Sequence, residues 1–417
     1  MARNSKENSS KKAALDYHEF PQPGKLEIRA TKPLANQRDL SRAYSPGVAE
    51  ACLEIKEDEN TASKYTSKGN LVAVISNGTA VLGLGNIGPG ASKPVMEGKA
   101  VLFKKFANID CFDIEVNEDN PQRLAEIVAS LEPTFGAINL EDIKAPDCFE
   151  VERLCKEKMK IPVFHDDQHG TAIVVGAAAV NAIELSNRKI ENTKIVAVGA
   201  GASGIACLEM LVKLGAKREN IWLSDSKGLI TKNRSEINEE KKRFSQDSNL
   251  SKLDDVVKDC DMFLGLSGPG VLTSKMVLKM NKQPIIFALA NPDPEINPAD
   301  ALKVAPDALI ATGRSDYPNQ VNNVLCFPFI FRGALDVGAT QINDEMKLAC
   351  IHAIANLARQ TSTAETVEAY QGEILKFGKE YLIPKPFDPR LLPNVAVAVA
   401  EAAMKSGVAS RPLKDVE

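Results

Sequence analysis

The sequence predicts an α/β protein with an N-terminal α/β domain, a Rossmann-like second domain and a C-terminal helical return. Short apolar runs alternate with stretches of helical pattern between residues 71 and 312, which is typical of parallel sheets. A length of 417 residues exceeds a single ordinary core and indicates at least two domains. A glycine-rich turn lies between two apolar runs near residue 200, which indicates a dinucleotide site.

The composition is that of a globular protein, with 44% hydrophobic and 25% charged residues and a net charge of −4. Nothing in this balance favours nucleic acid or an anionic membrane as a partner. No apolar run approaches the roughly 20 residues that span a bilayer. The eight cysteines form no C-x-x-C pair, so neither a zinc site nor a disulfide framework is indicated. Reduced thiols in a long α/β chain fit the cytoplasm.

The chain divides into four expected parts. Residues 1–14 are rich in Ser, Lys and Asn, lack the apolar core of a signal peptide, and are predicted to be a disordered lead. Residues 15–165 form the first domain and residues 166–335 the Rossmann-like domain. Residues 336–417 are mostly helical, clearest over 348–360 and 393–405, and we expect them to pack on the first domain or to form a subunit contact.

The first domain begins with the tract Arg42–Ala49, in which Pro46 and Gly47 predict a turn before a helix. Tyr44 precedes this turn, and its pattern alone favours an amphipathic residue at a core edge. The runs 71–76 and 80–84 flank an Asn-Gly pair, which predicts a β-hairpin.

A G-x-G-x-x-G pattern begins at Gly83, but we do not assign it to a dinucleotide. Pro89 and Gly90 follow its third glycine and are expected to delay the next helix to about residue 92, whereas a phosphate-binding turn needs a helix at once. These glycines are expected to let the backbone approach a small ligand or a neighbouring helix. The helix over 92–106 carries Lys99, for which a surface position is the default and a buried lysine with a lowered pKa is the alternative.

Two pairs of acids end successive strands of the first domain. The predicted strand 135–140 is followed by Glu141 and Asp142, and the strand 161–164 by His165, Asp166 and Asp167 in a loop before a helix. Consecutive parallel strands are usually neighbours, so the four carboxylates should meet at one sheet edge. Such charge requires a cation, and oxygen ligands select Mg²⁺ or Mn²⁺. The alternative is that each pair caps a helix; His165 and His169 are expected to be packing residues.

The second domain contains the full context of a dinucleotide fingerprint. The strand 194–198 leads into Gly199, Gly201 and Gly204, with Ala202 and Ser203 between them, then the helix 205–214 and the strand 221–224. Asp225 ends that strand 21 residues after Gly204 and can bond the ribose 2′-hydroxyl. Asp225 by itself favours NAD, whereas Lys227 could attract the phosphate of NADP.

Three further strands are expected over 260–266, 285–290 and 308–312. Asn291 follows the second of them, and Asn322 and Asn323 lie beyond the third. Asparagines in such loops serve either turns or ligand binding, and the pattern does not choose between the two.

Together these motifs resemble the malic enzyme family, in the family's order and over almost the whole chain. The residues that carry the resemblance are Arg42–Ala49, Ser76–Gly88, Glu141-Asp142, Phe164–Thr171, Gly199–Gly204, Ala290–Pro292 and Gln320–Pro328. The likeness is strongest to the compact bacterial form, and especially to the malic enzyme half of bacterial hybrids with a phosphotransacetylase-like domain. The chain is thus expected to be a standalone enzyme or a shortened hybrid.

The resemblance implies oxidative decarboxylation of L-malate to pyruvate and CO₂ with NAD or NADP and Mg²⁺ or Mn²⁺. It implies a cytoplasmic homodimer or higher homo-oligomer. By this resemblance, Glu141, Asp142 and Asp167 bind the metal. Lys99, beside Asp166, removes the proton of the C2 hydroxyl, and Tyr44 protonates the enol. Asn291 and Asn323 contact malate, and Asn291 also contacts the cofactor. The larger enzymes have a malate-binding arginine at the place of Ala80, so another group, such as the amides of residues 85–90, must meet the second carboxylate.

Two other functions remain open from the sequence. A metal-independent hydroxy-acid or amino-acid dehydrogenase would share the dinucleotide fingerprint, yet this function gives no role to the four carboxylates at residues 141, 142, 166 and 167. A non-catalytic, dinucleotide-responsive regulatory subunit would need neither Tyr44 nor Lys99.

Overall fold

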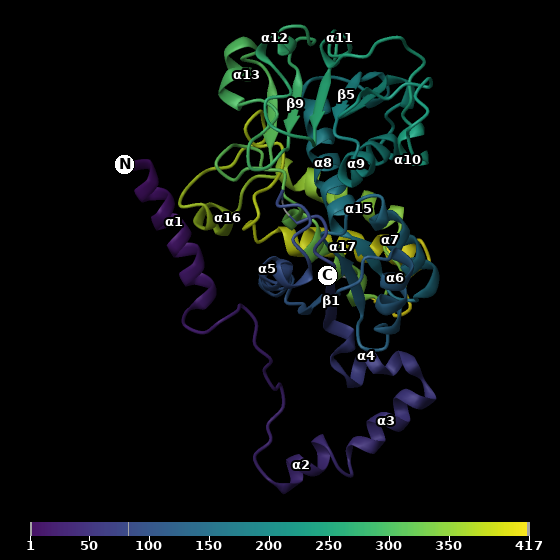
Figure 1. Cartoon of the computed structure of the whole chain (residues 1–417). Coiled ribbons are helices and arrows are strands. Elements are labelled where there is room, and N and C mark those ends of the chain that lie inside the picture. Colours follow the sequence, from purple (N-terminus) through teal and green to yellow (C-terminus); the bar gives the residue numbers. More distant parts are fainter. Residues whose placement is uncertain (1, 82, 415–417) are drawn as a thin grey trace.

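The computed structural model describes residues 2–81 and 83–414, with two α/β units stacked one above the other and an N-terminal arm beside them (Figure 1). The elements of the first unit are β1 (Leu71–Ser76), α5 (Pro89–Ala107), β2 (Asp110–Glu115), α6 (Pro121–Ser130), β3 (Ala137–Leu140), α7 (Asp147–Lys158) and β4 (Val163–His165). The strands form a parallel sheet of order β2-β1-β3-β4.

The strand β1 is buried on both faces, which explains its unbroken apolar sequence. Val72 and Val74 belong to the core that includes α5, whereas Leu71, Ala73 and Ile75 belong to the core under α6 and α7. Helices therefore cover both faces of this sheet and leave the carboxyl ends of its strands for a site.

The second unit contains the dinucleotide fingerprint. Its elements are α8 (Asp166–Leu185), β5 (Ile195–Val198), α9 (Ala202–Lys213), β6 (Ile221–Asp225), β7 (Gly228–Leu229), α10 (Glu239–Lys242), α11 (Leu253–Val256), β8 (Met262–Gly265), α12 (Ser274–Val277), β9 (Ile285–Ala288), α13 (Pro298–Val304) and β10 (Leu309–Thr312). The sheet order is β10-β9-β8-β5-β6-β7, and β7 alone among these described strands runs antiparallel to its neighbour. The chain leaves β5 to one side and later returns to β8 on its other side, so β5 marks the point where ligands bind in such sheets.

The C-terminal helices lie where the two units meet (Figure 1). They are α14 (Phe327–Asp336), α15 (Asp344–Arg359), α16 (Ala364–Ala369) and α17 (Leu391–Lys405). α14 packs against α5 and α17, and α15 packs against α8 and α17. The ring of Phe103 on α5 lies 4.8 Å from that of Phe327 and 5.2 Å from that of Phe331. This segment therefore fastens the first unit to the second.

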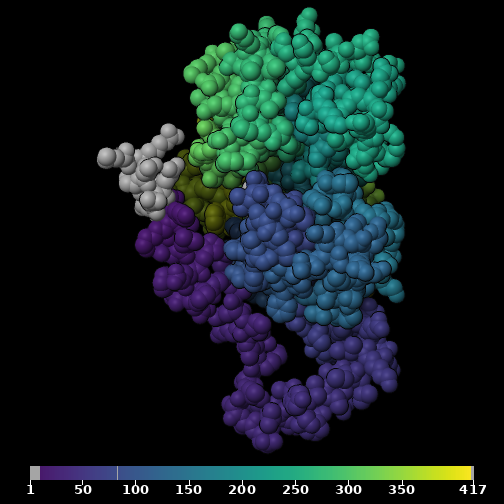
Figure 2. Space-filling view, in the orientation of Figure 1, coloured from purple at the N-terminus to yellow at the C-terminus, as the bar shows by residue number. Residues whose placement is uncertain are grey.

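The arm carries α1 (Ala2–Glu19), α2 (Gln37–Ala43), α3 (Val48–Glu57) and α4 (Ala62–Tyr65), and it runs along one side and below the body in Figure 2. Lys25 anchors it, because its backbone N–H donates to Glu97 Oε2 at 3.0 Å and its Nζ to the carbonyl of Pro94 at 2.8 Å. Residues 2–14 of the expected disordered lead lie within α1. Helix-forming residues and the Lys12–Asp16 pair at 2.6 Å stabilise that helix locally.

Three other expectations differ from the structure. Among the described residues no strand pairs with β1 as a hairpin, and Leu82 of the expected second strand lies outside them. Gly78 at φ +68° turns the chain, and its carbonyl accepts the N–H groups of Ile87 and Gly88. The helix expected from residue 92 already begins at Pro89, since proline suits the first helical position. Asp166 and Asp167 lie in the first turn of α8 rather than in a loop, where the helix dipole favours carboxylates. None of the described helices has both the length and the apolarity needed to cross a membrane.

Candidate active site

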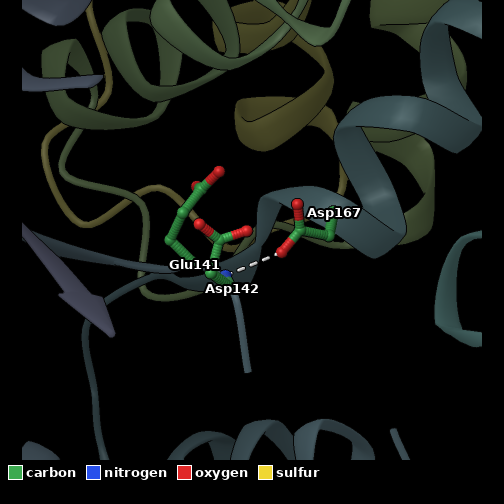
Figure 3. A group of neighbouring side chains, drawn as sticks. All are labelled: Glu141, Asp142 and Asp167. Carbon is green, nitrogen blue, oxygen red and sulfur yellow. Dashed lines mark hydrogen bonds between the residues drawn. The ribbon is translucent and has the colours of Figure 1, made fainter. Parts of the chain in front are cut away.

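Four carboxylates meet where β3 and β4 end, as the sequence predicts. Glu141 and Asp142 directly follow β3, Asp166 and Asp167 directly follow β4, and the two strands are paired through Leu140 and His165. Carboxylate oxygens of Glu141, Asp142 and Asp167 lie within 4.8 Å of one another. Figure 3 shows these three side chains grouped around one space, with the backbone N–H of Asp142 donating to Asp167 Oδ2 at 2.8 Å. We call Glu141, Asp142, Asp166 and Asp167 the acidic cluster.

The acidic cluster fits a hard divalent cation. Three of its members offer oxygen atoms at a spacing that one ion can bridge, and oxygen ligands suit Mg²⁺ and Mn²⁺. The Oδ2 atom of Asp142 is buried and has no hydrogen-bond partner among the described residues, so it is available as a ligand. An unpaired buried carboxylate oxygen is costly, and a bound cation would remove that cost.

Burial raises the pKa of every carboxyl group in the acidic cluster. The pKa of Glu141 rises to about 7, because burial outweighs the attraction of Lys99. The pKa of Asp142 rises to about 9, since the charges of Asp167 and Glu141 add to the effect of burial. Asp166 reaches about 7 and Asp167 about 6. Without a cation, the cluster therefore retains protons near neutral pH.

Lys99 projects from α5 into the acidic cluster and is 8% exposed, so the buried alternative holds and the surface default is wrong. Its Nζ lies 2.6 Å from Asp166 Oδ2, 2.9 Å from Glu141 Oε1 and 4.2 Å from the centre of the Phe327 ring. Burial lowers the pKa of Lys99, but Asp166 and Glu141 outweigh burial, and the pKa lies above its ordinary value. The lowered pKa that a catalytic base needs is therefore absent while these carboxylates are charged and bind no cation.

Asn323 also belongs to this site. Its Nδ2 donates to Asp166 Oδ2, the same oxygen that receives Lys99. A Cβ atom at Gly170 would lie 1.9 Å from Asp166 Oδ1, so this glycine leaves room for the carboxylate. The structure thus brings together Lys99, Glu141, Asp166 and Asn323 from four separate stretches of the chain.

Two supporting residues escaped the sequence analysis. Asn139 on β3 donates from Nδ2 to Glu141 Oε2 at 2.8 Å. Glu152 on α7 accepts the backbone N–H of His165 at 3.2 Å and binds His169 Nε2 at 2.8 Å, which fixes the start of α8. A polar residue within an otherwise apolar strand was the available signal for Asn139. The two histidines act as packing residues and lie outside the metal cluster found among the described residues.

The glycine loop after β5 fits a dinucleotide. A Cβ at Gly199 would lie 2.2 Å from the Leu266 carbonyl oxygen, and one at Gly204 would lie 1.9 Å from the Gly199 carbonyl oxygen, whereas Gly201 faces open space. The open space lies at the N-terminus of α9, which favours a pyrophosphate. Ser203 donates from its hydroxyl to the carbonyl of Asp167 at 2.7 Å. This bond joins the cofactor loop directly to the helix of the acidic cluster.

Asp225 ends β6 beside the glycine loop, as the fingerprint requires, but its carboxylate is already bonded to Arg234 and Lys241. Asn291 is exposed just after β9, and its Nδ2 would lie 2.6 Å from a Cβ at Gly313. No described contact joins Asn291 to the acidic cluster.

Tyr44 is not brought to this site within one chain. It is the C-terminal cap of α2 and is 75% exposed, and α2 lies on the arm, away from α5 (Figure 1). Ala80 donates its N–H to the Asp142 carbonyl at 2.9 Å, so the loop after β1 borders the acidic cluster. The amides of Gly85, Ile87 and Gly88 donate to the carbonyls of Val81 and Gly78, whereas those of Asn86 and Gly90 have no backbone partner among the described residues.

The comparisons with known proteins agree with this geometry. The family model described as "Malic enzyme, N-terminal domain" matches residues 23–126, and "Malic enzyme, NAD binding domain" matches residues 168–370. The chain is 61% identical to the NADP-dependent malic enzyme of Haemophilus influenzae and 60% identical to the NAD-dependent malic enzyme of Rhizobium meliloti. Each alignment covers 97% of this chain, but only 54% and 53% of those two proteins, so the chain spans about half their length.

A solved structure is similar over nearly its whole length. The malic enzyme from Pyrococcus horikoshii matches with a TM-score of 0.89 and 42% identity, covering 97% of this chain and 93% of that one. The fold, the acidic cluster at the ends of β3 and β4, and the glycine loop after β5 all occur in a chain that matches two malic enzyme domain models. The protein therefore belongs to the malic enzyme family.

Proposed function

We propose that the chain catalyses the oxidative decarboxylation of L-malate to pyruvate and CO₂, with NAD or NADP as oxidant and Mg²⁺ or Mn²⁺ as required cation. The observation that carries this proposal is the acidic cluster beside buried Lys99, joined to the cofactor loop through Ser203. Both bacterial relatives are named as malic enzymes, although for different cofactors. All eight cysteines are free thiols, which agrees with a cytoplasmic enzyme.

The described residues suit distinct parts of the reaction. Glu141, Asp142 and Asp167 would hold the cation, which would supply Lewis-acid chemistry when bound and would offset the charge of Glu141, one of the two carboxylates that raise the pKa of Lys99. Lys99 accepts the proton of the C2 hydroxyl as hydride leaves C2 for the nicotinamide. Asp166 orients Lys99, and Asn323 holds Asp166 in place, since Asp166 Oδ2 accepts from both Lys99 Nζ and Asn323 Nδ2. Asn291 lies after β9 and serves malate and the nicotinamide end of the cofactor.

Tyr44 requires a second copy of the chain in this proposal. Neither α2 nor α3 buries any residue, and the arm exposes Leu34, Leu40 and Leu53 at 65%, 42% and 57%. Exposed apolar side chains along a protruding segment indicate an interaction surface. We assign this surface to a homodimer in which each arm places Tyr44 at the partner's acidic cluster, where it protonates the enol of pyruvate.

Mixed dimers test this assignment. Tyr44→Phe and Lys99→Ala should each be nearly inactive alone. Refolded together, they should recover about one quarter of wild-type activity, because half of the dimers are mixed and each has one intact site. Tyr44→Phe refolded alone under the same conditions is the control. Recovery that stays at background would place Tyr44 outside the partner's site.

The first measurement follows the absorbance of reduced nicotinamide with L-malate, Mn²⁺ and either NAD or NADP, with pyruvate assayed in parallel. We expect reduced cofactor and pyruvate in equal amounts, and neither in EDTA. Activity that survives EDTA would favour the metal-independent dehydrogenase. Full turnover by Lys99→Ala would remove Lys99 from the mechanism, and absence of any turnover together with dinucleotide binding would favour a regulatory subunit.

A further inference from the structure

The carboxylate of Asp225 is saturated by hydrogen bonds within the protein. Its Oδ1 accepts from Arg234 Nη1 at 2.9 Å and from the backbone N–H of Lys227 at 2.9 Å. Its Oδ2 accepts from Arg234 Nη2 at 3.1 Å and from Lys241 Nζ at 3.0 Å. A carboxylate offers about four acceptor positions, so none remains for the two hydroxyls of an NAD ribose.

The charge around Asp225 is positive. Lys227, Arg234 and Lys241 supply three cations, and we call them the basic cluster. Asp225 and Glu236, which pairs with Lys227 Nζ at 2.7 Å, supply two anions, so the net charge of these five groups is +1. Burial raises the pKa of Asp225, but the hydrogen bonds from Arg234 and Lys241 outweigh it and lower the pKa to about 2. Asp225 therefore holds the side chains of Arg234 and Lys241 in place and is not itself free to bind a ligand.

The basic cluster belongs to an ordered part of the chain. The N–H of Ile230 donates to the Leu223 carbonyl of β6, and Gln246 donates from Nε2 to the Ile221 carbonyl. Phe244, on the segment between Ile230 and Gln246, is buried at 1% exposed and anchors that segment. The side chains of Arg234 and Lys241 nevertheless remain 18% and 24% exposed, so an anion can reach them.

The basic cluster also lies where the adenosine ribose of a dinucleotide is bound. The N–H of Gly199 donates to the carbonyl of Ser224, the residue before Asp225, at 3.0 Å. The end of β6 is thus adjacent to the glycine loop that accepts the pyrophosphate. A phosphate on the ribose 2′-oxygen would meet arginine and lysine donors, which bind phosphate strongly.

We propose that Arg234 and Lys241, assisted by Lys227, bind the 2′-phosphate of NADP, and that the chain prefers NADP to NAD. This rests on the proposed function, because it names the cofactor of that reaction. The sequence pattern assigned Asp225 to a ribose hydroxyl and left Lys227 as the candidate for a phosphate.

Calorimetric binding of 2′,5′-ADP and 5′-ADP to the metal-free protein tests the proposal without turnover. The protein should bind 2′,5′-ADP at least about 10-fold more tightly than 5′-ADP, with a preference that weakens as salt is raised. Arg234→Gln and Lys241→Gln should each remove most of that preference and leave 5′-ADP binding unchanged. Lys242→Gln, the neighbouring lysine that pairs with Glu239, is the matched control and should behave as wild type.

Equal binding of the two nucleotides, or loss of both in Lys241→Gln with the fold intact by circular dichroism, would overturn the assignment. Lys241 is the safer variant, because Arg234 also donates to the carbonyls of Gly228 and Leu229 and its loss could disturb the loop. If 2′,5′-ADP binds preferentially but malate is not oxidised, the proposed function fails while the phosphate site stands. If malate is oxidised equally well with both cofactors, only the phosphate site fails.

Discussion

The acidic cluster and the surroundings of Asp225 use the same structural position with opposite electrostatic results. Both place carboxylates directly after parallel strands, β3 and β4 in one case and β6 in the other. In the acidic cluster four carboxylates face Lys99, burial dominates, and their pKa values rise. At Asp225 one carboxylate faces Arg234 and Lys241, and its pKa falls. The first region is therefore suited to a cation and the second to an anion.

This difference teaches that the role of a strand-end acid depends on which distant segment covers it. The basic side chain in the first region, Lys99, comes from α5. Those in the second region, Arg234 and Lys241, come from the chain after β7.

Asp167→Asn should lower malate turnover by more than about 100-fold. Losing a residue that only hydrogen-bonds to a metal ligand costs about 10- to 100-fold, and losing the ligand itself should cost more. The amide keeps an oxygen that can accept the N–H of Asp142, so the fold should survive. Mn²⁺ should raise the melting temperature of the wild type and not of this variant. Asp300→Asn, at an exposed side chain of α13, is the control. Unchanged stabilisation by Mn²⁺ would show that Asp167 is not a ligand.

Lys99→Met should destabilise the metal-free protein by about 3 kcal/mol, because it leaves the buried carboxylates of Asp166 and Glu141 without a counter-charge. Urea unfolding at pH 8 in EDTA measures this effect. Lys104→Met on the same helix is the matched control, and its exposed pair with Asp110 should contribute less than about 1 kcal/mol. Equal losses in the two variants would contradict the buried pairing.

The metal-free protein should lose stability as pH rises. The folded-state pKa values of Glu141 and Asp142, about 7 and about 9, exceed their unfolded values, so the folded state binds more protons across that range. Stability in EDTA should therefore fall steadily between pH 5 and pH 9. The fall should be smaller with Mn²⁺ and in Asp167→Asn. A stability in EDTA that does not change with pH would mean that folding does not raise the pKa values of Glu141 and Asp142.

Asp225→Asn should show the opposite dependence on pH and the smallest effect. The folded-state pKa of Asp225, about 2, lies below its unfolded value, so its stabilisation is present above about pH 4 and is lost as pH falls. The variant should be about 1 kcal/mol less stable than the wild type at pH 7, since the ion pairs are partly exposed. Urea unfolding between pH 7 and pH 3 should show this difference shrinking. A difference that grows in acid would reverse the assignment.

The sequence determined the parts of this protein that depend on local pattern. Apolar runs gave the strands, and the spacing from Gly199 to Asp225 gave the dinucleotide turn, because a tight turn, a helix start and a strand end need particular residues at fixed separations. Acids after two successive strands predicted that Glu141, Asp142 and Asp167 meet, since consecutive parallel strands share an edge. The same local reasoning placed the start of α8 too late and expected a hairpin after β1.

Only the tertiary structure decided the charge state and the surroundings of these groups. Lys99 could be exposed or buried until α5 packed against the first sheet and placed its amine between Glu141 and Asp166. Asp225 could bind a ribose until Arg234 and Lys241 covered it. Tyr44 matched the family motif, yet it caps α2 on the arm and is 75% exposed. Electrostatic interactions depend on distance and burial between residues far apart in sequence, and local pattern carries neither quantity.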